Sequence, residues 1–241
     1  MNPSSHLEPH PGTNPPSFQC TVVDSKVENE VTWISLDRSL FYPTGGGQPC
    51  DIGALEYGGR TIAVEEVVKR SRQWHKIGSE SIESDTEVTA YIDTERRNKL
   101  STMHTAQHLV SALADELFSG STVGNQIGEV KTRIDLSFPD RSSFDKELLQ
   151  QEVNRTISEG LPVKMHFAPR MEVVEDPLVR VNLDLLPKHI DELRVISIQG
   201  VDVCPCAGTH VENTSEIQPI EITRVKSKGS GKLRLEYELT E

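Results

Sequence analysis

Two short motifs carry side chains of the kinds that bind transition metals. His104-x-x-x-His108 places two imidazoles four residues apart, a spacing that puts both on one face of a helix. About a hundred residues later, Cys206-x-x-x-His210 offers a thiolate and a third imidazole across small residues that permit a tight turn. Imidazole nitrogen and thiolate sulfur are ligands that zinc prefers. We therefore predict one zinc ion per chain, bound by His104, His108, Cys206 and His210.

Other metal motifs fit these residues less well. A zinc protease of the His-Glu-x-x-His type needs a glutamate after the first histidine as its general base, and Thr105 stands there. A structural zinc finger uses two close pairs with a short segment between them, whereas about a hundred residues lie between these pairs. The set therefore predicts a metal site that joins distant parts of a fold. The ligands alone leave open whether this site is catalytic or a purely structural clamp.

Composition and charge limit the class of protein. The 241 residues are 35% hydrophobic and 26% charged, as in soluble globular proteins, and no run of 18 or more apolar residues predicts a membrane span. The N-terminus lacks the basic start and apolar stretch of a secretory signal, so we expect a cytoplasmic protein. Cys204 and Cys206 are too close to pair without strain. A net charge of −12 argues against non-specific coating of nucleic acid, so any such contact must be local.

The first part of the chain has the pattern of strands. Residues 1–17 contain five prolines and no apolar periodicity, which predicts a flexible tail. From residue 18 to 93, short runs of β-branched residues alternate with polar turns. These runs lie at residues 18–23, 31–36, 60–68, 73–77 and 87–92. Strands without a helix predict a small β-barrel over 18–93, with a sandwich as the alternative.

The second part mixes helices with strands. The period changes at Asp93, a helix-capping residue, and an apolar stripe from Leu100 to Leu117 predicts a long helix over 94–118. A loop is predicted at 119–129. The further predicted elements are a strand at 130–138, a helix at 144–159 and strands at 163–168, 193–198, 216–226 and 232–239. We therefore predict an α+β protein with a two-layer α/β domain over 94–241, in which the long helix binds the zinc.

Three separated motifs together resemble one known family. The glycine-rich segment 41–49 with Asp51-x-Gly53, the pair His104-x-x-x-His108, and the segment 202–211 occur in the order and at the spacing of that family. The family is that of the alanyl-tRNA editing domain, specifically its free-standing AlaX-type proteins. The resemblance covers the chain from about residue 18 to the C-terminus and points to the medium-length form. At position 207 the chain has alanine where the family usually has glycine, which should be tolerated unless the backbone needs a positive φ.

The resemblance implies an activity and a partner. It implies a trans-editing hydrolase that deacylates mischarged tRNA(Ala), with Ser-tRNA(Ala) as the main substrate and Gly-tRNA(Ala) as a further candidate. It also implies that the catalytic domain of the synthetase is absent, and we expect a monomer or a weak homodimer. The alternative function is a non-catalytic tRNA-binding module in which the zinc is structural.

Candidate residues around the zinc follow from the substrate that the resemblance implies. Seryl and alanyl groups differ by one hydroxyl, so selection needs polar contacts, for which we propose Gln107, Thr209 and Gln126, with the backbone of Gly208 bordering the amino acid. Support of the histidines is the alternative role of Gln107 and Thr209. Asp202 is the nearest acidic candidate for a base, with ligand orientation as its alternative role. Whether the zinc activates water or positions the substrate stays open, because four protein ligands fill a tetrahedral shell.

A basic segment near the C-terminus is the candidate contact for tRNA. Residues 224–234 hold five positive side chains and no acidic one, and the central Gly-Ser-Gly predicts a β-hairpin. We propose Lys228, Lys232 and Arg234 as phosphate contacts, with an ordinary lysine-protected sheet edge as the alternative. The glycines of segment 45–47 lack the lysine of a P-loop, so we expect them to permit close backbone packing between the barrel and the second domain.

Overall fold

The computed structural model describes residues 17–180, 190–229 and 231–240, which form two compact units. The first unit contains residues 17–45 and 49–98, and the second contains 46–48 together with the described residues from 99 onwards. The predicted flexible tail lies outside the described residues, apart from Ser17. Residues 46–48, the tip of the glycine-rich loop, thus belong to the unit that also holds the predicted metal ligands.

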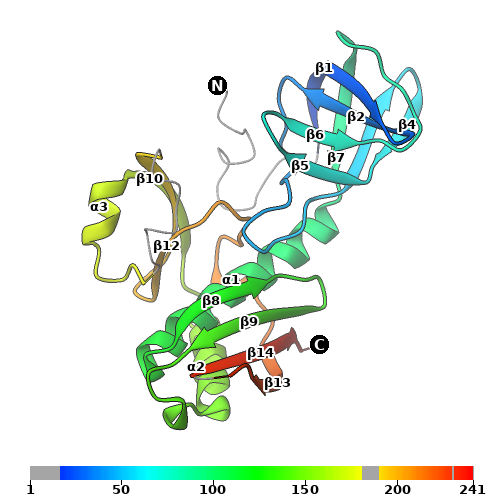
Figure 1. Cartoon of the computed structure of the whole chain (residues 1–241). Coiled ribbons are helices and arrows are strands. Elements are labelled where there is room, and N and C mark those ends of the chain that lie inside the picture. The colour runs from blue at the N-terminus through cyan, green and yellow to red at the C-terminus, as the bar shows by residue number, and fades with distance from the viewer. Residues whose placement is uncertain (1–16, 181–189, 230, 241) are drawn as a thin grey trace. The chain divides into compact units, whose positions relative to one another are not determined.

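The first unit is one seven-stranded antiparallel sheet with the strand order β4-β3-β7-β1-β2-β6-β5 (Figure 1). Its strands are β1 (Ser17–Glu28), β2 (Val31–Leu36), β3 (Gly53–Tyr57), β4 (Arg60–Val64), β5 (Glu66–Lys69), β6 (Gln73–Lys76) and β7 (Glu87–Ile92). Buried and exposed residues alternate along β1 and β7, as expected for a sheet with one face on the core. Val22, Ile34, Leu55 and Ala90 are among the fully buried residues of that core.

The predicted closed barrel is wrong, because this sheet is open. Its edge strands β4 and β5 pair with β3 and β6 respectively, and no ladder joins β4 to β5 among the described residues. Only Glu65 separates the two strands along the chain, which is too short for the turn that would bring them side by side. The run predicted as one strand over 60–68 is therefore two strands at opposite edges of the sheet.

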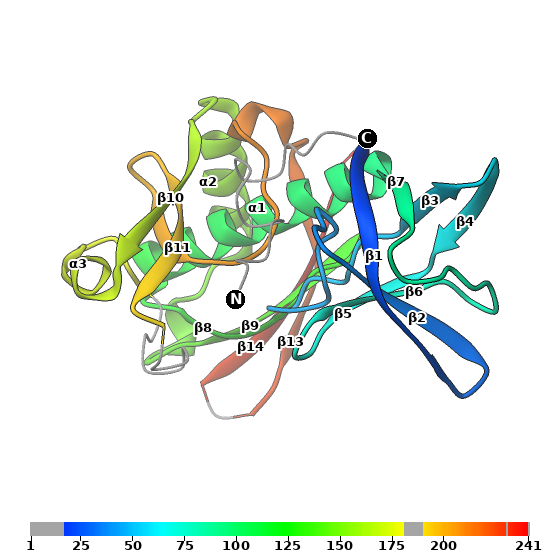
Figure 2. The same ribbon diagram turned by 90° about the horizontal axis from the view of Figure 1, so that it is seen from above.

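The second unit is built on α1 (Thr94–Phe118), whose residues 94–98 belong to the first unit. Asp93 caps the helix by accepting a hydrogen bond from the Arg96 backbone N at 3.0 Å. Every residue from 100 to 110 is buried, instead of the single apolar stripe that the sequence suggested. One core cluster explains this, because it joins residues of α1 to residues of the four-stranded sheet and of the helix α2 (Lys146–Ser158), and Figure 2 shows these elements around α1. The hydroxyl of Tyr237 in that sheet donates to Met103 O at 2.6 Å.

Two antiparallel sheets complete the second unit. The four-stranded sheet has the order β13-β14-β9-β8, and the three-stranded sheet has the order β10-β11-β12. Their bounds are β8 (Ser121–Gln126), β9 (Lys131–Ser137), β10 (Val163–Pro169), β11 (Glu192–Ile198), β12 (Asp202–Pro205), β13 (Ile220–Ser227) and β14 (Lys232–Leu239), and a short helix α3 (Arg170–Glu175) follows β10. The α+β class is thus confirmed, while β3, β8, β12 and α3 are elements that the sequence patterns missed. Of the helices described, none has the length and apolar character to cross a membrane.

Candidate metal centre

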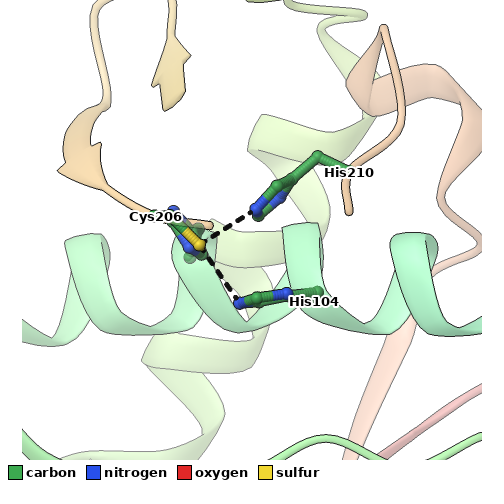
Figure 3. A group of neighbouring side chains, drawn as sticks. His104, Cys206 and His210 are labelled. Carbon is green, nitrogen blue, oxygen red and sulfur yellow. Dashed lines mark hydrogen bonds between the residues drawn. The ribbon is translucent and has the colours of Figure 1, made fainter. Parts of the chain in front are cut away.

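The four predicted ligands come together in the second unit, and Figure 3 shows three of them, His104, Cys206 and His210. His104 and His108 lie on α1, Cys206 follows the end of β12, and His210 comes one short loop later. Their ligand atoms all lie within 4.8 Å of one another. The sulfur of Cys206 is 3.6 Å from His104 Nε2 and 3.4 Å from His210 Nε2. A tetrahedral zinc with bonds of about 2.3 Å to sulfur and about 2.0 Å to nitrogen needs a separation of about 3.5 Å, so the group fits a metal ion.

Each of the three histidines is held at Nδ1 by a polar side chain. The pairs are His104 with Gln48 Oε1 at 2.7 Å, His108 with Asp202 Oδ2 at 2.8 Å, and His210 with Thr105 Oγ1 at 3.1 Å. Gln48 Oε1 also accepts from the backbone N of Thr209, so it is an acceptor toward His104. The Thr105 hydroxyl donates to Ser101 O at 2.9 Å and is therefore an acceptor toward His210. Each Nδ1 thus keeps its proton, which leaves Nε2 as the atom of each imidazole that can bind a metal.

The two neighbouring cysteines differ in their ionisation. Burial raises the pKa of the Cys206 thiol, but the charges of His104 and His210 and hydrogen bonds from His104 and His108 outweigh burial and hold it well below its usual range. Burial and the charge of Asp202 raise the pKa of Cys204 well above its usual range. Cys206 is therefore a thiolate ready to bind a metal, while Cys204 keeps its proton.

Histidine ionisation also depends on these contacts. Burial lowers the pKa of His108, but the hydrogen bonds to Asp202 and Cys206 raise it to about 10. Burial together with the charge of His104 lowers the pKa of His210 well below its usual range. Because metal binding needs a free lone pair on each imidazole, binding must release the second proton from His108.

The loop that carries Cys206 and His210 is fixed by a buried arginine and by close packing. Arg194 Nη1 donates to Cys206 O at 2.7 Å and to Gly208 O at 3.0 Å. A Cβ at Gly208 would clash with the imidazole of His104 and lie 3.0 Å from Gln48 Oε1, so only glycine fits there. Ala207 is not among the residues with positive φ, so its methyl group is accommodated, as expected.

Thr209 and Asp202 lie beside the ligands. The Thr209 hydroxyl accepts from Gln48 Nε2 and from Ser101 Oγ, each at 2.9 Å. Asp202 is 4% exposed, and its second carboxylate oxygen accepts from Arg180, which forms an ion pair with it. Both oxygens of Asp202 are therefore engaged, an arrangement that suits orientation of His108 better than proton transfer.

Gln107 and Gln126 are the two candidate residues for substrate selection. Gln107 is buried on α1, where it donates to Ser111 Oγ at 2.6 Å and accepts from Asn125 Nδ2 at 3.3 Å. Gln126 is exposed at the end of β8. These contacts leave the proposed roles of Gln107 and Gln126 in substrate selection as predictions.

The basic segment forms the predicted hairpin of β13 and β14. Lys228 and Lys232 are exposed at its tip, where the Lys228 N donates to Lys232 O at 3.0 Å. Arg234 differs, because its guanidinium donates to both oxygens of Asp135 at 2.7 and 2.8 Å. The two lysines are therefore exposed charges at the tip of the hairpin, whereas the charge of Arg234 is balanced by Asp135.

Several residues of this centre were missed by sequence reasoning. Gln48, Thr105 and Arg180 hold ligands or a ligand's partner, and Arg194 holds the loop. Gln48 could have been found, because it stands in the glycine-rich motif that the family resemblance singled out. Arg180 and Arg194 lie outside every motif, so no signal in a single sequence marks them.

Comparisons with known proteins agree on one family. Family models described as "Threonyl and Alanyl tRNA synthetase second additional domain" and "tRNA synthetases class II (A)" match residues 193–236 and 18–96. The alanyl-tRNA editing protein AlaX-M of Methanosarcina barkeri is 33% identical over 93% of this chain and 94% of its own length. AlaX-M of Saccharolobus solfataricus is 33% identical over 88% and 90%. AlaX-L of Pyrococcus horikoshii is 31% identical over 90% of this chain but 53% of its own length. The chain belongs to the AlaX-type family of alanyl-tRNA editing proteins.

Proposed function

We propose that this chain is a zinc-dependent hydrolase that removes serine from mischarged Ser-tRNA(Ala) in trans. The observation that carries the proposal is the buried group of three imidazoles and one thiolate, each imidazole held at Nδ1 by a separate partner. Soft sulfur with imidazole nitrogen favours zinc and disfavours magnesium or calcium, which prefer oxygen ligands. The names of the relatives supply the reaction class, since they are alanyl-tRNA editing proteins.

Thr209 is the residue that we assign to the reacting ester. His104, His108, Cys206 and His210 would hold the zinc, which when bound would supply a positive charge to polarise the ester or a water. Because the Thr209 hydroxyl already accepts hydrogen bonds from Gln48 and Ser101, its own proton is left for another acceptor. We propose that this proton is donated to the ester carbonyl oxygen, where negative charge develops during hydrolysis.

The remaining candidate residues handle selection and docking. In this proposal Gln107 and Gln126 contribute polar contacts that favour a seryl over an alanyl group. Lys228 and Lys232 bind tRNA phosphates, because both side chains are exposed at the tip of the hairpin. Arg234 supports the hairpin through Asp135.

A deacylation panel tests the proposed function. Zinc-loaded protein is incubated with Ser-tRNA(Ala), Gly-tRNA(Ala), Ala-tRNA(Ala) and Ser-tRNA(Ser), and the amino acid released is measured over time. We expect rapid loss of serine from tRNA(Ala), slower loss of glycine, and intact Ala-tRNA(Ala) and Ser-tRNA(Ser). Protein stripped of metal by a chelator should be inactive and recover when zinc is restored.

The panel also tests the alternative of a tRNA-binding module with a structural metal. That module would bind Ser-tRNA(Ala) in a filter assay without releasing serine in the presence of zinc. Release of serine that persists in folded, zinc-free protein would instead remove the metal from the reaction. Either outcome would contradict the proposed function.

A further inference from the structure

The glycine-rich loop brings Gln48 into the ligand group. Gln48 is 1% exposed, accepts from His104 Nδ1 at 2.7 Å and from Thr209 N at 3.1 Å, and donates to Thr209 Oγ1 at 2.9 Å. Gly47, the residue before it, accepts from Ile127 N at 2.8 Å. A displacement of Gln48 would therefore disturb a metal ligand and the proposed catalytic hydroxyl at once.

The base of the same loop is closed by Tyr42 and Asp51. The Asp51 N donates to Tyr42 O at 2.9 Å, and the Tyr42 N donates to the Asp51 carboxylate. Inside this closure, Cys50 N donates to Thr44 Oγ1 at 3.2 Å. Along the chain, only Pro49 and Cys50 separate Asp51 from Gln48. The position of Asp51 therefore limits where Gln48 can lie.

Asp51 is in turn held by Arg97 on α1. Arg97 Nε donates to Asp51 Oδ1 at 2.8 Å, and Arg97 Nη2 donates to Asp51 Oδ2 and to Leu40 O, the latter at 2.9 Å. The side chain of Asp51 is 0% exposed and that of Arg97 is 2% exposed. Arg97 precedes His104 by about two turns of the same helix. The ion pair thus ties the base of the loop to the helix that carries two of the ligands.

Stability alone is a poor explanation for this pair. A buried ion pair loses the hydration of both charges, and apolar residues of similar volume often replace one without loss. Arg97 Nη1 also has no hydrogen-bond partner among the described residues, which adds to the cost of burial. What the forked contact does provide is geometry, because two parallel hydrogen bonds fix both the position and the orientation of the carboxylate.

We propose that Asp51 and Arg97 are a positioning pair, which places the glycine-rich loop so that Gln48 reaches His104 and Thr209. The pair acts through Gln48 and touches neither metal nor substrate. Its catalytic consequence rests on the proposed function, but its effect on the loop does not.

The first test uses Asp51→Asn, which keeps the size of the side chain and removes its charge. We expect kcat for Ser-tRNA(Ala) deacylation at saturating zinc to fall by about tenfold with unchanged KM, and zinc affinity to fall by about tenfold because His104 loses its partner. We also expect the amides of Ile127 and Thr209, which donate to the loop, to exchange with deuterium about tenfold faster. Arg60→Gln is the matched control, because it breaks the exposed ion pair with Glu80 in the same unit and should change none of these values.

The second test asks whether the effect passes through Gln48. In a Gln48→Ala background, Asp51→Asn should lower kcat no further, because the loop no longer delivers the amide. An equal loss in both backgrounds would show that Asp51 acts by another route and would overturn the proposal. Unchanged exchange of Ile127 and Thr209 in Asp51→Asn would overturn it too, even if the protein had no deacylase activity.

Arg97→Lys separates positioning from folding. It keeps the positive charge but loses the fork, so we expect the same local increase in exchange with little change in the thermal unfolding midpoint. If both variants instead raise exchange throughout the first unit, the pair is a folding element and the proposal is wrong.

Discussion

Replacing Thr105 with valine removes one hydrogen-bond acceptor and keeps the volume of the side chain. The Thr105 hydroxyl is fully buried and accepts from His210 Nδ1 at 3.1 Å and from Val211 N at 3.2 Å. Valine would leave both of these buried donors without this partner. The variant therefore tests whether the support of His210 determines how tightly the metal is held.

The structure sets the expected size of the effect. Loss of the partner of a ligating imidazole typically lowers metal affinity by about 10- to 100-fold. The hydrogen bond to Thr105 joins neutral groups at 3.1 Å, so we expect the lower end, about tenfold, or about 1.4 kcal/mol. The unpaired Val211 N should lower the free energy of unfolding by a further contribution of about 1–3 kcal/mol.

Zinc affinity is measured by titrating metal-stripped protein against a chromophoric chelator, with far-UV circular dichroism to verify the fold. Thr105→Ser is the matched control, because it keeps the hydroxyl and should bind zinc within about twofold of the parent chain. Zinc binding by Thr105→Val that is as tight as in the parent chain would refute the role of this hydroxyl.

Three other perturbations have defined outcomes. Burial lowers the pKa of His75 from 6.5 to about 4, so the unfolded chain takes up the proton first. The contribution of His75 to the free energy of unfolding should be complete above pH 6.5 and fall by about 3 kcal/mol toward pH 4. Urea denaturation at several pH values measures this, and His75→Gln should lose this pH dependence. The same pH dependence in His75→Gln would contradict the role of His75. Thr209→Val should lower kcat by about 100-fold at full zinc occupancy while Thr209→Ser stays active, and equal activities would exclude a catalytic hydroxyl. The double variant Lys228→Glu with Lys232→Glu should raise KM by about tenfold and weaken the salt dependence of KM. Lys164→Glu on β10 is the control and should change neither value. An unchanged KM in the double variant would exclude the hairpin as a contact for tRNA.

The elements that the sequence predicted well have local signals at both ends. The predicted range 94–118 is that of α1, because Asp93 is a visible cap and Ser119-Gly120 ends the helix. Strand β8 had no such signal, since Ser121–Gln126 is polar, contains a glycine and is mostly exposed. It exists as a strand through pairing with β9, which a local pattern does not reveal.

The candidate site also has a part that the sequence predicts and a part that it does not. Its ligand set could be predicted because helical spacing brings His104 and His108 together and a short loop joins Cys206 to His210. The partners could not, since Gln48 lies 56 residues from His104 and meets it only in the folded chain. The open sheet of the first unit could not be predicted either, because the sequence pattern does not show which strands pair. Glu65 alone separates the edge strands β4 and β5, which is too short a link for a turn between them.

The most direct test of the account compares alanine substitutions at two neighbouring cysteines. Cys206 is a thiolate among the imidazoles, whereas Cys204 keeps its proton two residues away. For each variant, bound zinc is measured by mass spectrometry and serine release from Ser-tRNA(Ala) by acid precipitation. We expect Cys206→Ala to lose zinc and deacylation while Cys204→Ala keeps both. Full zinc occupancy and normal serine release in Cys206→Ala would contradict a catalytic metal centre at these residues.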